Sequence, residues 1–362
     1  MIFTVNEYFI GSMSPSGYKT NFNETLNLTD YFTYILKGEA SCSGFIKRIT
    51  DEFSDLDKDI YYCAVDPESI DAVVFPEKKI IICDSITPHL FEPKIAGISG
   101  QIVNLSESWD TEKLSAERSL LEELHASLIS QSERAERCIK ALSTVVYDNF
   151  DLATRTVLLE KLDAYFGRLC KKILPKHSKN QQDDNNDNKR GKVSYKLITA
   201  ITALGYTTLT PKEGGIYILD DDYFAGSNYL LSRLIAEAAS RGFDVTVSLN
   251  PIMTDSDSGK VLHIHIPELS LWFLTSSGIA PLDCSEKITT VNFKRFYAKN
   301  LLSAKRQRMR FNSDAAMSLL SEAVGALQTV RDVKSSTEKY YEKVIEGTVI
   351  EEVKAKIVKS LQ

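Results

Sequence analysis

The chain has 362 residues, of which 43% are hydrophobic and 25% charged, as is typical of a globular protein long enough for two domains. Its 43 Lys and Arg and 49 Asp and Glu residues give a net charge of −6, so no basic excess indicates nucleic acid as the main partner. No apolar run approaches the roughly 20 residues that span a bilayer, and the N-terminus lacks the features of a signal peptide. Six scattered cysteines without paired spacing favour reduced thiols and a cytoplasmic location.

A polar segment near the middle divides the chain. Lys176–Lys192 reads KHSKNQQDDNNDNKRGK and contains no apolar residue that could be buried. Such a composition predicts a linker. We therefore expect a first domain at residues 1–175, a linker at 176–192 and a second domain at 193–362.

The two sides of this linker carry similar motifs in the same order. Gly205-Tyr206 follows Gly17-Tyr18 by 188 positions, Leu230-Leu231 follows Phe45-Ile46 by 185, and Pro267-Glu268 follows Pro76-Glu77 by 191. Matches in one order at a nearly constant offset indicate an internal duplication. The small drift in the offset is what insertions in loops would produce.

The expected elements follow this duplication. Tyr31–Lys37 and Gly215–Leu219 are predicted as buried strands, each leading through a turn into a helix, and the second helix, about 227–241, should end at Gly242. Further strands are predicted at Tyr61–Val65, Ile80–Cys83, Phe243–Leu249 and Leu271–Leu274. This order predicts an α/β fold of two tandem three-layer domains, each with a parallel sheet covered by helices.

Two longer segments have the apolar period of helices. They span about residues 110–172 and 313–361, and their apolar stripes contain Leu120, Leu121, Leu124 and Leu128 in the first segment and Met317, Leu320, Val324 and Leu327 in the second. We expect each segment to form a helical hairpin appended to its own sheet domain. The stripes would then be core, with a groove for a protein partner as the alternative.

The two strand–turn–helix units have the layout of a phosphate-binding loop. An active P-loop, G-x-x-x-x-G-K-[ST], adds a lysine for the phosphates and a hydroxyl for Mg²⁺. In the Gly38–Gly44 turn, Cys42 takes the place of the lysine and Ser43 that of the hydroxyl, and the turn is about two residues short. In the second half Gly226 remains, Ser227 and Asn228 take the two places, and Asp220–Asp222 would repel a triphosphate.

Candidate site residues come mainly from the first half: Lys37, Gly38, Ser41, Ser43, Gly44, Asp84 and His89, with Gly226, Ser227 and Asn228 as second-half equivalents. Asp84 ends an apolar strand, as does a Walker B aspartate that orients Mg²⁺ through water, although it could instead cap the next turn. His89 lies just beyond that strand and could contact phosphate or act as a base; a locally hydrogen-bonded loop histidine is the alternative. His263 and His265 could share a metal ion, but no third ligand stands at a recognisable spacing.

Several motifs together resemble a family of bacterial tandem P-loop proteins known only as ATPases or ATP-binding proteins of unassigned process. They are a strand ending Leu36-Lys37-Gly38, then Asp66-Pro67-Glu68-Ser69-Ile70-Asp71, Pro76-Glu77, Ile80–Asp84, Pro88-His89, Asn104-Leu105, Trp109-Asp110 and Glu338-Lys339-Tyr340-Tyr341. The resemblance covers nearly the whole chain apart from the linker. It implies two P-loop NTPase domains and binding of ATP with Mg²⁺. This chain departs from the family at the two lysines that define activity.

Three functions are compatible with these features. The absence of both lysines favours a pseudo-ATPase that binds a nucleotide or another anion, or regulates a partner, without hydrolysis. An ATP-binding enzyme that uses Lys37 or Lys47 instead is the second possibility. A structural or assembly protein that binds a partner through its helical hairpins is the third. Any retained ligand site is expected in the first half, because Thr275 stands in the second half at the place of Asp84.

Overall fold

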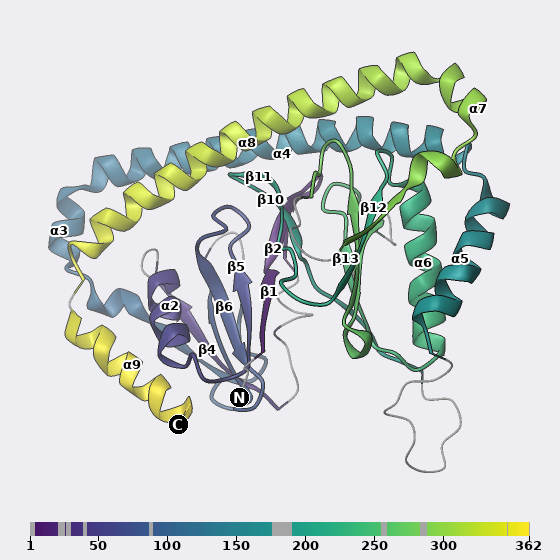
Figure 1. The fold of residues 1–362 in the computed structure, drawn as a ribbon. Helices are drawn as coiled ribbons and strands as arrows, with labels where there is room; N and C mark the ends of the chain where they lie inside the picture. The colour runs from purple at the N-terminus through teal and green to yellow at the C-terminus, as the bar shows by residue number, and fades with distance from the viewer. Residues whose placement is uncertain are drawn as a thin grey trace, which may run out of the picture.

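The structure is a computed structural model that describes residues 4–20, 26, 30–38, 42–86, 90–175, 190–254, 259–282, 288–345 and 347–361. Two six-stranded sheets, each with helices beside it, lie below a pair of long crossing helices (Figure 1). Each strand and helix given below for the described part of the first repeat has a counterpart in the second, so the internal duplication is also visible in the fold.

The elements of the first repeat are β1 Val5–Phe9, β2 Gly11–Ser14, β3 Gly17–Thr20, β4 Phe32–Lys37, α2 Cys42–Glu52, β5 Lys58–Tyr62, β6 Ile70–Phe75, β7 Ile80–Asp84, β8 Gly100–Asn104, the 3₁₀ helix η1 Leu105–Ser108, α3 Thr111–Ala116, α4 Arg118–Thr154 and α5 Leu159–Ile173. Those of the second are β9 Val193–Tyr195, β10 Thr199–Thr202, β11 Gly205–Thr208, β12 Gly215–Asp220, α6 Ala225–Ser240, β13 Val245–Leu249, β14 Val261–Ile266, η3 Pro267–Leu269, β15 Leu271–Ser276, β16 Ile288–Asn292, η4 Phe293–Phe296, α7 Lys299–Ala304, α8 Arg306–Glu342 and α9 Gly347–Leu361.

Both sheets have the same strand order and both are mixed. The orders are β1-β5-β6-β7-β4-β8 and β9-β13-β14-β15-β12-β16, and β6 and β14 run antiparallel to both of their neighbours. The prediction of purely parallel sheets is therefore wrong for one strand in each sheet. The reason is the Pro-Glu motif, which lies in a four-residue turn between β6 and β7 that is too short for a parallel crossover. Lys79 and Ser270 adopt positive φ at the equivalent place of the two turns.

Helix α6 ends as the sequence predicts. Gly242 has a φ of +82°, its N–H donates to the carbonyl of Ala239, and the N–H of Phe243 donates to that of Ala238. This is the Schellman pattern, in which glycine avoids the steric cost of the left-handed conformation. The chain then enters β13 directly, so the stop at Gly242 sets the geometry between α6 and the second sheet.

The two long helices pair with each other across the repeats. Helix α4 runs antiparallel to α8 (Figure 1), with an Arg134–Glu322 ion pair of 2.5 Å and a hydrogen bond from Asn149 to the carbonyl of Met309. The prediction of a helical hairpin inside each repeat is therefore wrong, because the antiparallel partner of each helix belongs to the other repeat. The predicted stripes differ in burial: Leu320 and Leu327 are buried, the leucines from 120 to 128 are half-buried, and Met317 is exposed.

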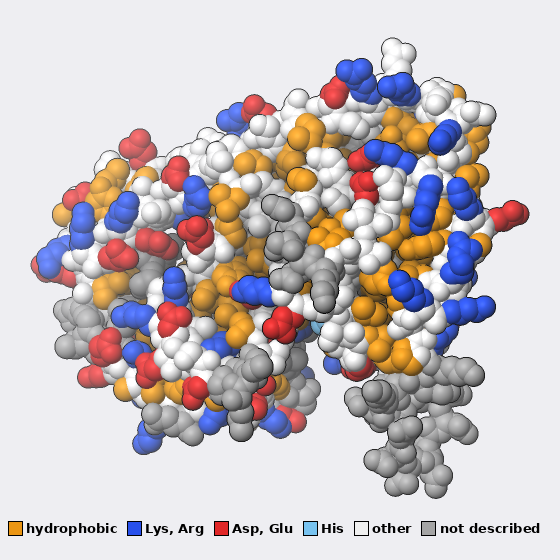
Figure 2. All heavy atoms as spheres, viewed as in Figure 1, with side chains coloured by type: hydrophobic (Ala, Val, Ile, Leu, Met, Phe, Trp, Pro, Cys, Tyr) orange, Lys and Arg blue, Asp and Glu red, His pale blue; other side chains and the backbone are white. Residues whose placement is uncertain are grey.

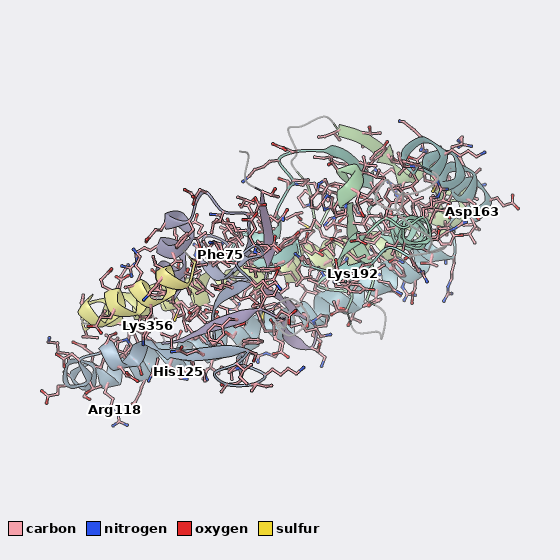
Figure 3. The ribbon with its side chains drawn as sticks, turned by 90° about the horizontal axis from the view of Figure 1, so that it is seen from below. Phe75, Arg118, His125, Asp163, Lys192 and Lys356 are labelled. Atoms are coloured by element: carbon pink, nitrogen blue, oxygen red, sulfur yellow. The ribbon has the colours of Figure 1, made fainter. Side chains whose placement is uncertain are left out.

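Each repeat also places its last helix on the sheet domain of the other. Helix α5 packs on α6, where Asp163 accepts hydrogen bonds from Tyr229 and Arg233. Helix α9 packs beside α2, with a Lys354–Glu52 ion pair of 2.8 Å. Figure 3 accordingly shows Asp163 and Lys356 towards opposite ends of the molecule. The predicted linker thus separates the repeats along the chain, whereas the packed units contain helices from both.

The exchange of helices between the repeats is reciprocal, so the two repeats are related by an approximate two-fold axis. An isolated bridge joins Trp109 to Ile345, and its equivalent joins Tyr297 to Val157. A further bridge pairs Phe9 with Leu197, two residues at corresponding positions of the two repeats. Between the sheets, Ile35 and Cys83 share one buried cluster with Ile216 and Leu274 of the second repeat.

The described part of the surface mixes charged and apolar side chains. Within the described ranges, no helix has the length and apolarity needed to cross a membrane. The five cysteines that the structure describes are free thiols. Figure 2 shows acidic and basic side chains mixed over the first repeat, and Lys and Arg side chains gathered over α5 and α6.

Candidate functional site

The loop between β12 and α6 is filled by its own aspartate. Asp221 is 1% exposed, and its carboxylate accepts hydrogen bonds from the N–H of Ser227 (2.8 Å), the N–H of Tyr223 (3.3 Å) and the hydroxyl of Tyr297 (2.7 Å). The Tyr297 hydroxyl also accepts the N–H of Gly226 at 2.9 Å. Burial raises the pKa of the Asp221 carboxyl, and these donors act in the opposite direction. The N–H groups that would cradle a phosphate are thus already bonded to an internal anion.

No room remains beside this carboxylate. A Cβ built on Gly226 would lie 2.7 Å from Cδ1 of Phe293 and 3.3 Å from the Tyr297 hydroxyl. Gly226 is required there because an aromatic wall approaches the backbone closely. The other two aspartates of this segment are bonded elsewhere, Asp220 to Asn292 and Asp222 to Lys294. The predicted anion site of the second repeat is therefore closed.

The corresponding loop of the first repeat has no carboxylate at the position of Asp221, and the next residue, Glu39, lies outside the described residues. Gly38 stands where Asp221 stands, since both directly follow the equivalent strands β4 and β12. The thiol of Cys42 donates to the carbonyl of Gly38 at 3.2 Å, and Ser41 lies outside the described residues. Trp109 takes the place of Tyr297, and its buried Nε1–H has no hydrogen-bond acceptor in the described part of the chain.

Ser43 and Asn228 occupy equivalent positions, and the side chain of each accepts a hydrogen bond from a backbone N–H. The Ser43 hydroxyl accepts the N–H of Ile70 at 2.8 Å, and Oδ1 of Asn228 accepts the N–H of Val261 at 2.9 Å. Each contact fastens the start of a helix to the first residue of β6 or β14. The sequence placed these two residues at the magnesium-binding position, and the structure gives both a contact within the fold. Gly44 is exposed, and a Cβ there would meet nothing within 4 Å.

The remaining predicted residues of the first repeat do not converge on one point. Asp84 is buried at the end of β7, directly opposite Leu36 of β4. Lys37 forms a 2.5 Å ion pair with Glu92. Lys47 lines a cavity of about 450 Å³ with Glu7, Asp51 and Glu68, and the cavity wall does not include the loop. His89 lies outside the described residues.

Sequence reasoning missed two charged residues that the structure brings to Asp84. Asp71 is the second residue of β6, one position beyond the Ala72–Cys83 pair, so it lies opposite Asp84 on the next strand. Lys334 reaches the same region from α8 of the second repeat. Burial lowers the pKa of its ammonium, whereas Cys63, Asp71, Asp84 and Glu338 raise it, and the net effect is a raised pKa. Burial raises the pKa of the neighbouring Cys63 thiol to about 12, so this thiol is neutral at physiological pH.

The same positions are almost free of charge in the second repeat. By the register of equivalent elements, Asp71 corresponds to Leu262, Asp84 to Thr275, Lys334 to Val146 and Glu338 to Phe150. Leu262, Val146 and Phe150 pack together in one hydrophobic cluster. The first repeat therefore carries four charged residues at positions where the second has three apolar residues and one threonine, although both repeats have the same order of elements. The only sequence signal was Asp71 within the Asp66–Asp71 motif.

His263 and His265 serve the fold. The Thr275 N–H donates to Nδ1 of His263 at 3.1 Å, which leaves Nε2–H to donate to the Thr199 hydroxyl at 2.9 Å. A metal ion could bind His263 only by displacing one of these partners. His265 stacks on Trp272 with ring centroids 3.7 Å apart. Within the described ranges, no group of three or more His, Cys, Asp or Glu residues is placed to hold a metal ion.

The comparisons with known proteins add no assignment. No protein-family model, no curated protein and no solved structure matches this chain. The functional argument therefore depends on the geometry of the two loops and on the charged residues beside the first.

Proposed function

We propose that this chain is a non-hydrolysing relative of P-loop NTPases, in which the first repeat binds a phosphate-bearing ligand and the second is a closed copy. ATP is the first candidate ligand, and a cytoplasmic binding or regulatory role is part of the proposal. The observation that carries it is the contrast between Asp221, a carboxylate held inside the second loop, and Gly38 at the corresponding position of the first, where the Nε1–H of Trp109, the counterpart of Tyr297, has no acceptor among the described residues. The second repeat thus displays, with its own carboxylate, the contacts that an external anion would make in the first.

The other functions receive less support. An ATPase that uses Lys37 or Lys47 would have to break the Lys37–Glu92 pair or reach the loop from the separate cavity that Lys47 lines. A partner-binding hairpin loses much of its surface, because α4 and α8 cover each other. Hydrolysis also needs a lysine that neither loop supplies, and the Ser43 hydroxyl of the first loop already accepts the N–H of Ile70.

Isothermal titration with ATP and Mg²⁺ tests the proposal. We expect one binding site per chain and no phosphate release above the protein-free blank. Gly38→Asp, which introduces the carboxylate of the second repeat, should abolish binding, because it supplies the anion from within. Asp221→Asn is the matched control and should leave binding unchanged.

Two equal sites, or phosphate turnover that Asp84→Asn removes, would contradict the proposal. Failure to bind ATP, inorganic triphosphate or phosphate at millimolar concentration would also contradict it. Circular dichroism on each variant separates loss of binding from loss of the fold.

A further inference from the structure

One segment of the second repeat carries cations that the fold does not require. Residues 292–312, which run from the end of β16 through α7 into α8, contain seven basic residues and no acidic residue. The seven are Lys294, Arg295, Lys299, Lys305, Arg306, Arg308 and Arg310. The equivalent segment of the first repeat, residues 104–124, contains six acidic and two basic residues. Because both segments form the same elements, the fold does not account for the positive charge.

The segment between α4 and α5 and the start of α5 add cations to the same end of the molecule. The N–H of Ala298 donates to the carbonyl of Thr156, and the ammonium of Lys161 donates to the carbonyl of Arg295 at 2.7 Å. Figure 1 accordingly shows α5, α7 and the start of α8 together at one end. Five exposed cations there form no ion pair within the described ranges, and we call them the basic end: Arg155, Lys161, Arg295, Lys299 and Arg306. Their charges are thus available to a partner.

Exposed leucines accompany these cations. They are Leu158, Leu159 and Leu301, whose exposed fractions are 39%, 50% and 55%. The N–H of Leu158 donates to the carbonyl of Phe296, so the first two leucines lie beside the segment that leads into α7, which contains the third. At the places of Leu159 and Leu301 the first repeat has Gly347 and Lys113. The fold therefore does not require an apolar side chain at either position.

Cations mixed with exposed leucines fit the surface of an anionic membrane. Lipid phosphates attract Lys and Arg side chains, as the phosphates of nucleic acids also do. The leucines decide between the two partners, because a leucine gains free energy when it leaves water for the acyl-chain boundary of a bilayer. A phosphate backbone offers a leucine no such apolar contact. Charge therefore selects an anionic partner, and the leucines select a lipid.

We propose that the basic end docks on an anionic membrane surface, with its cations against lipid phosphates and the three leucines among the headgroups. The contact is peripheral and needs no spanning helix. The equivalent end of the first repeat, with its six acidic residues, would be repelled by the same lipids, so the docking is specific to one end. The inference goes beyond the proposed function, since it concerns the end of the molecule opposite α2 (Figure 1).

Sedimentation of the full chain with vesicles of phosphatidylglycerol and phosphatidylcholine in equal parts tests the inference. Wild type should bind these vesicles, should not bind vesicles of phosphatidylcholine alone, and should be released by high salt. The double variant Lys299→Gln/Arg306→Gln should weaken binding by about tenfold or more. Leu301→Ser keeps every charge and should weaken binding by about fivefold.

Matched control variants change other parts of the surface. Lys339→Gln/Lys343→Gln removes two exposed cations near the far end of α8, and Ile129→Ser removes an apolar side chain of α4 that is 45% exposed. Both controls should bind the vesicles as wild type. Circular dichroism on every variant separates loss of binding from loss of the fold.

The outcomes separate this inference from the proposed function. Wild-type affinity in the Lys299→Gln/Arg306→Gln variant, or an equal loss in both control variants, would overturn it. Binding to duplex DNA in place of the anionic vesicles at the same salt concentration would assign the basic end to nucleic acid and overturn it as well. ATP titration should give the wild-type result for every variant, so binding of vesicles and binding of ATP can fail independently.

Discussion

Buried polar side chains in the second repeat bond to each other rather than to a ligand. Asp221 and His263 are each about 1% exposed, and each has its hydrogen-bonding atoms engaged by protein donors or acceptors. Such groups are costly to leave unpaired, so they fix the local structure. Burial of a titratable side chain such as His263 also makes the free energy of unfolding depend on pH, because burial disfavours its charged form.

His263 should make the protein less stable in acid. Burial lowers its pKa to about 3, well below the ordinary value near 6.5 of an unfolded chain. Between these two values the unfolded chain binds a proton that the folded protein does not, so the free energy of unfolding falls as the pH falls from 6.5. The loss approaches about 1.4 kcal/mol per pH unit.

Urea denaturation of wild type and His263→Gln between pH 7 and pH 4.5 measures this effect. The slope of the unfolding free energy against pH should decrease by about one proton in the variant. His125→Gln, at an exposed position of α4, is the control and should retain the wild-type slope. An unchanged slope in His263→Gln would contradict a neutral, buried His263.

Single residues at the site were only partly predictable. Cys42, Ser43, Ser227 and Asn228 were recognised because the loop motif has fixed spacing. Lys334 was missed, because its place beside Asp84 depends on how a distant helix crosses the sheet, and no local pattern records that. Asp71 belongs to a recognisable motif, but its position opposite Asp84 follows from the antiparallel pairing of β6 with β7, which the alternation of apolar residues does not show.

At the scale of elements, the exchange of α5 and α9 makes each sheet domain depend on the other repeat. Ile357 of α9 is 1% exposed and belongs to the cluster beneath α2, and Leu169 is its counterpart in α5. Strands and helices were largely predictable, since hydrophobic periodicity shows that a face is buried. It does not show which element covers that face, so the exchange could not be read from the sequence.

Ile357→Ala should loosen the first repeat although the residue belongs to the second. Removing the buried side chain should cost about 2–5 kcal/mol of stability. Hydrogen exchange measured by mass spectrometry should increase in α2 and much less in α6. Leu169→Ala is the matched variant and should give the reverse pattern. Faster exchange in α6 alone after Ile357→Ala would contradict the exchanged arrangement.

At the scale of the whole molecule, the two repeats are joined by many non-covalent contacts in addition to the linker. The α4–α8 pair, the exchanged helices and the Lys196–Asp59 ion pair of 2.7 Å all join the two halves. The repeats should therefore remain together without a covalent connection.

Cleavage within the linker tests this expectation. A specific protease site inserted between residues 176 and 189 should yield two fragments that elute together in size-exclusion chromatography and separate only in denaturant. ATP binding should survive the cut, since the loop proposed to bind the ligand lies within the first fragment and Tyr341 of the second fragment should stay stacked on Trp109. Two folded fragments that elute separately would contradict the prediction.

The approximate two-fold arrangement has a consequence for how the two sites could come to differ. If such repeats were identical subunits of a homodimer, a substitution of glycine by aspartate at the loop would close both sites at once. In a single chain, the carboxylate of Asp221 closes one site and leaves Gly38 in the other. Fusion of the repeats thus permits one half to become scaffold, and that scaffold still packs its helix α9 against the sheet domain of its neighbour.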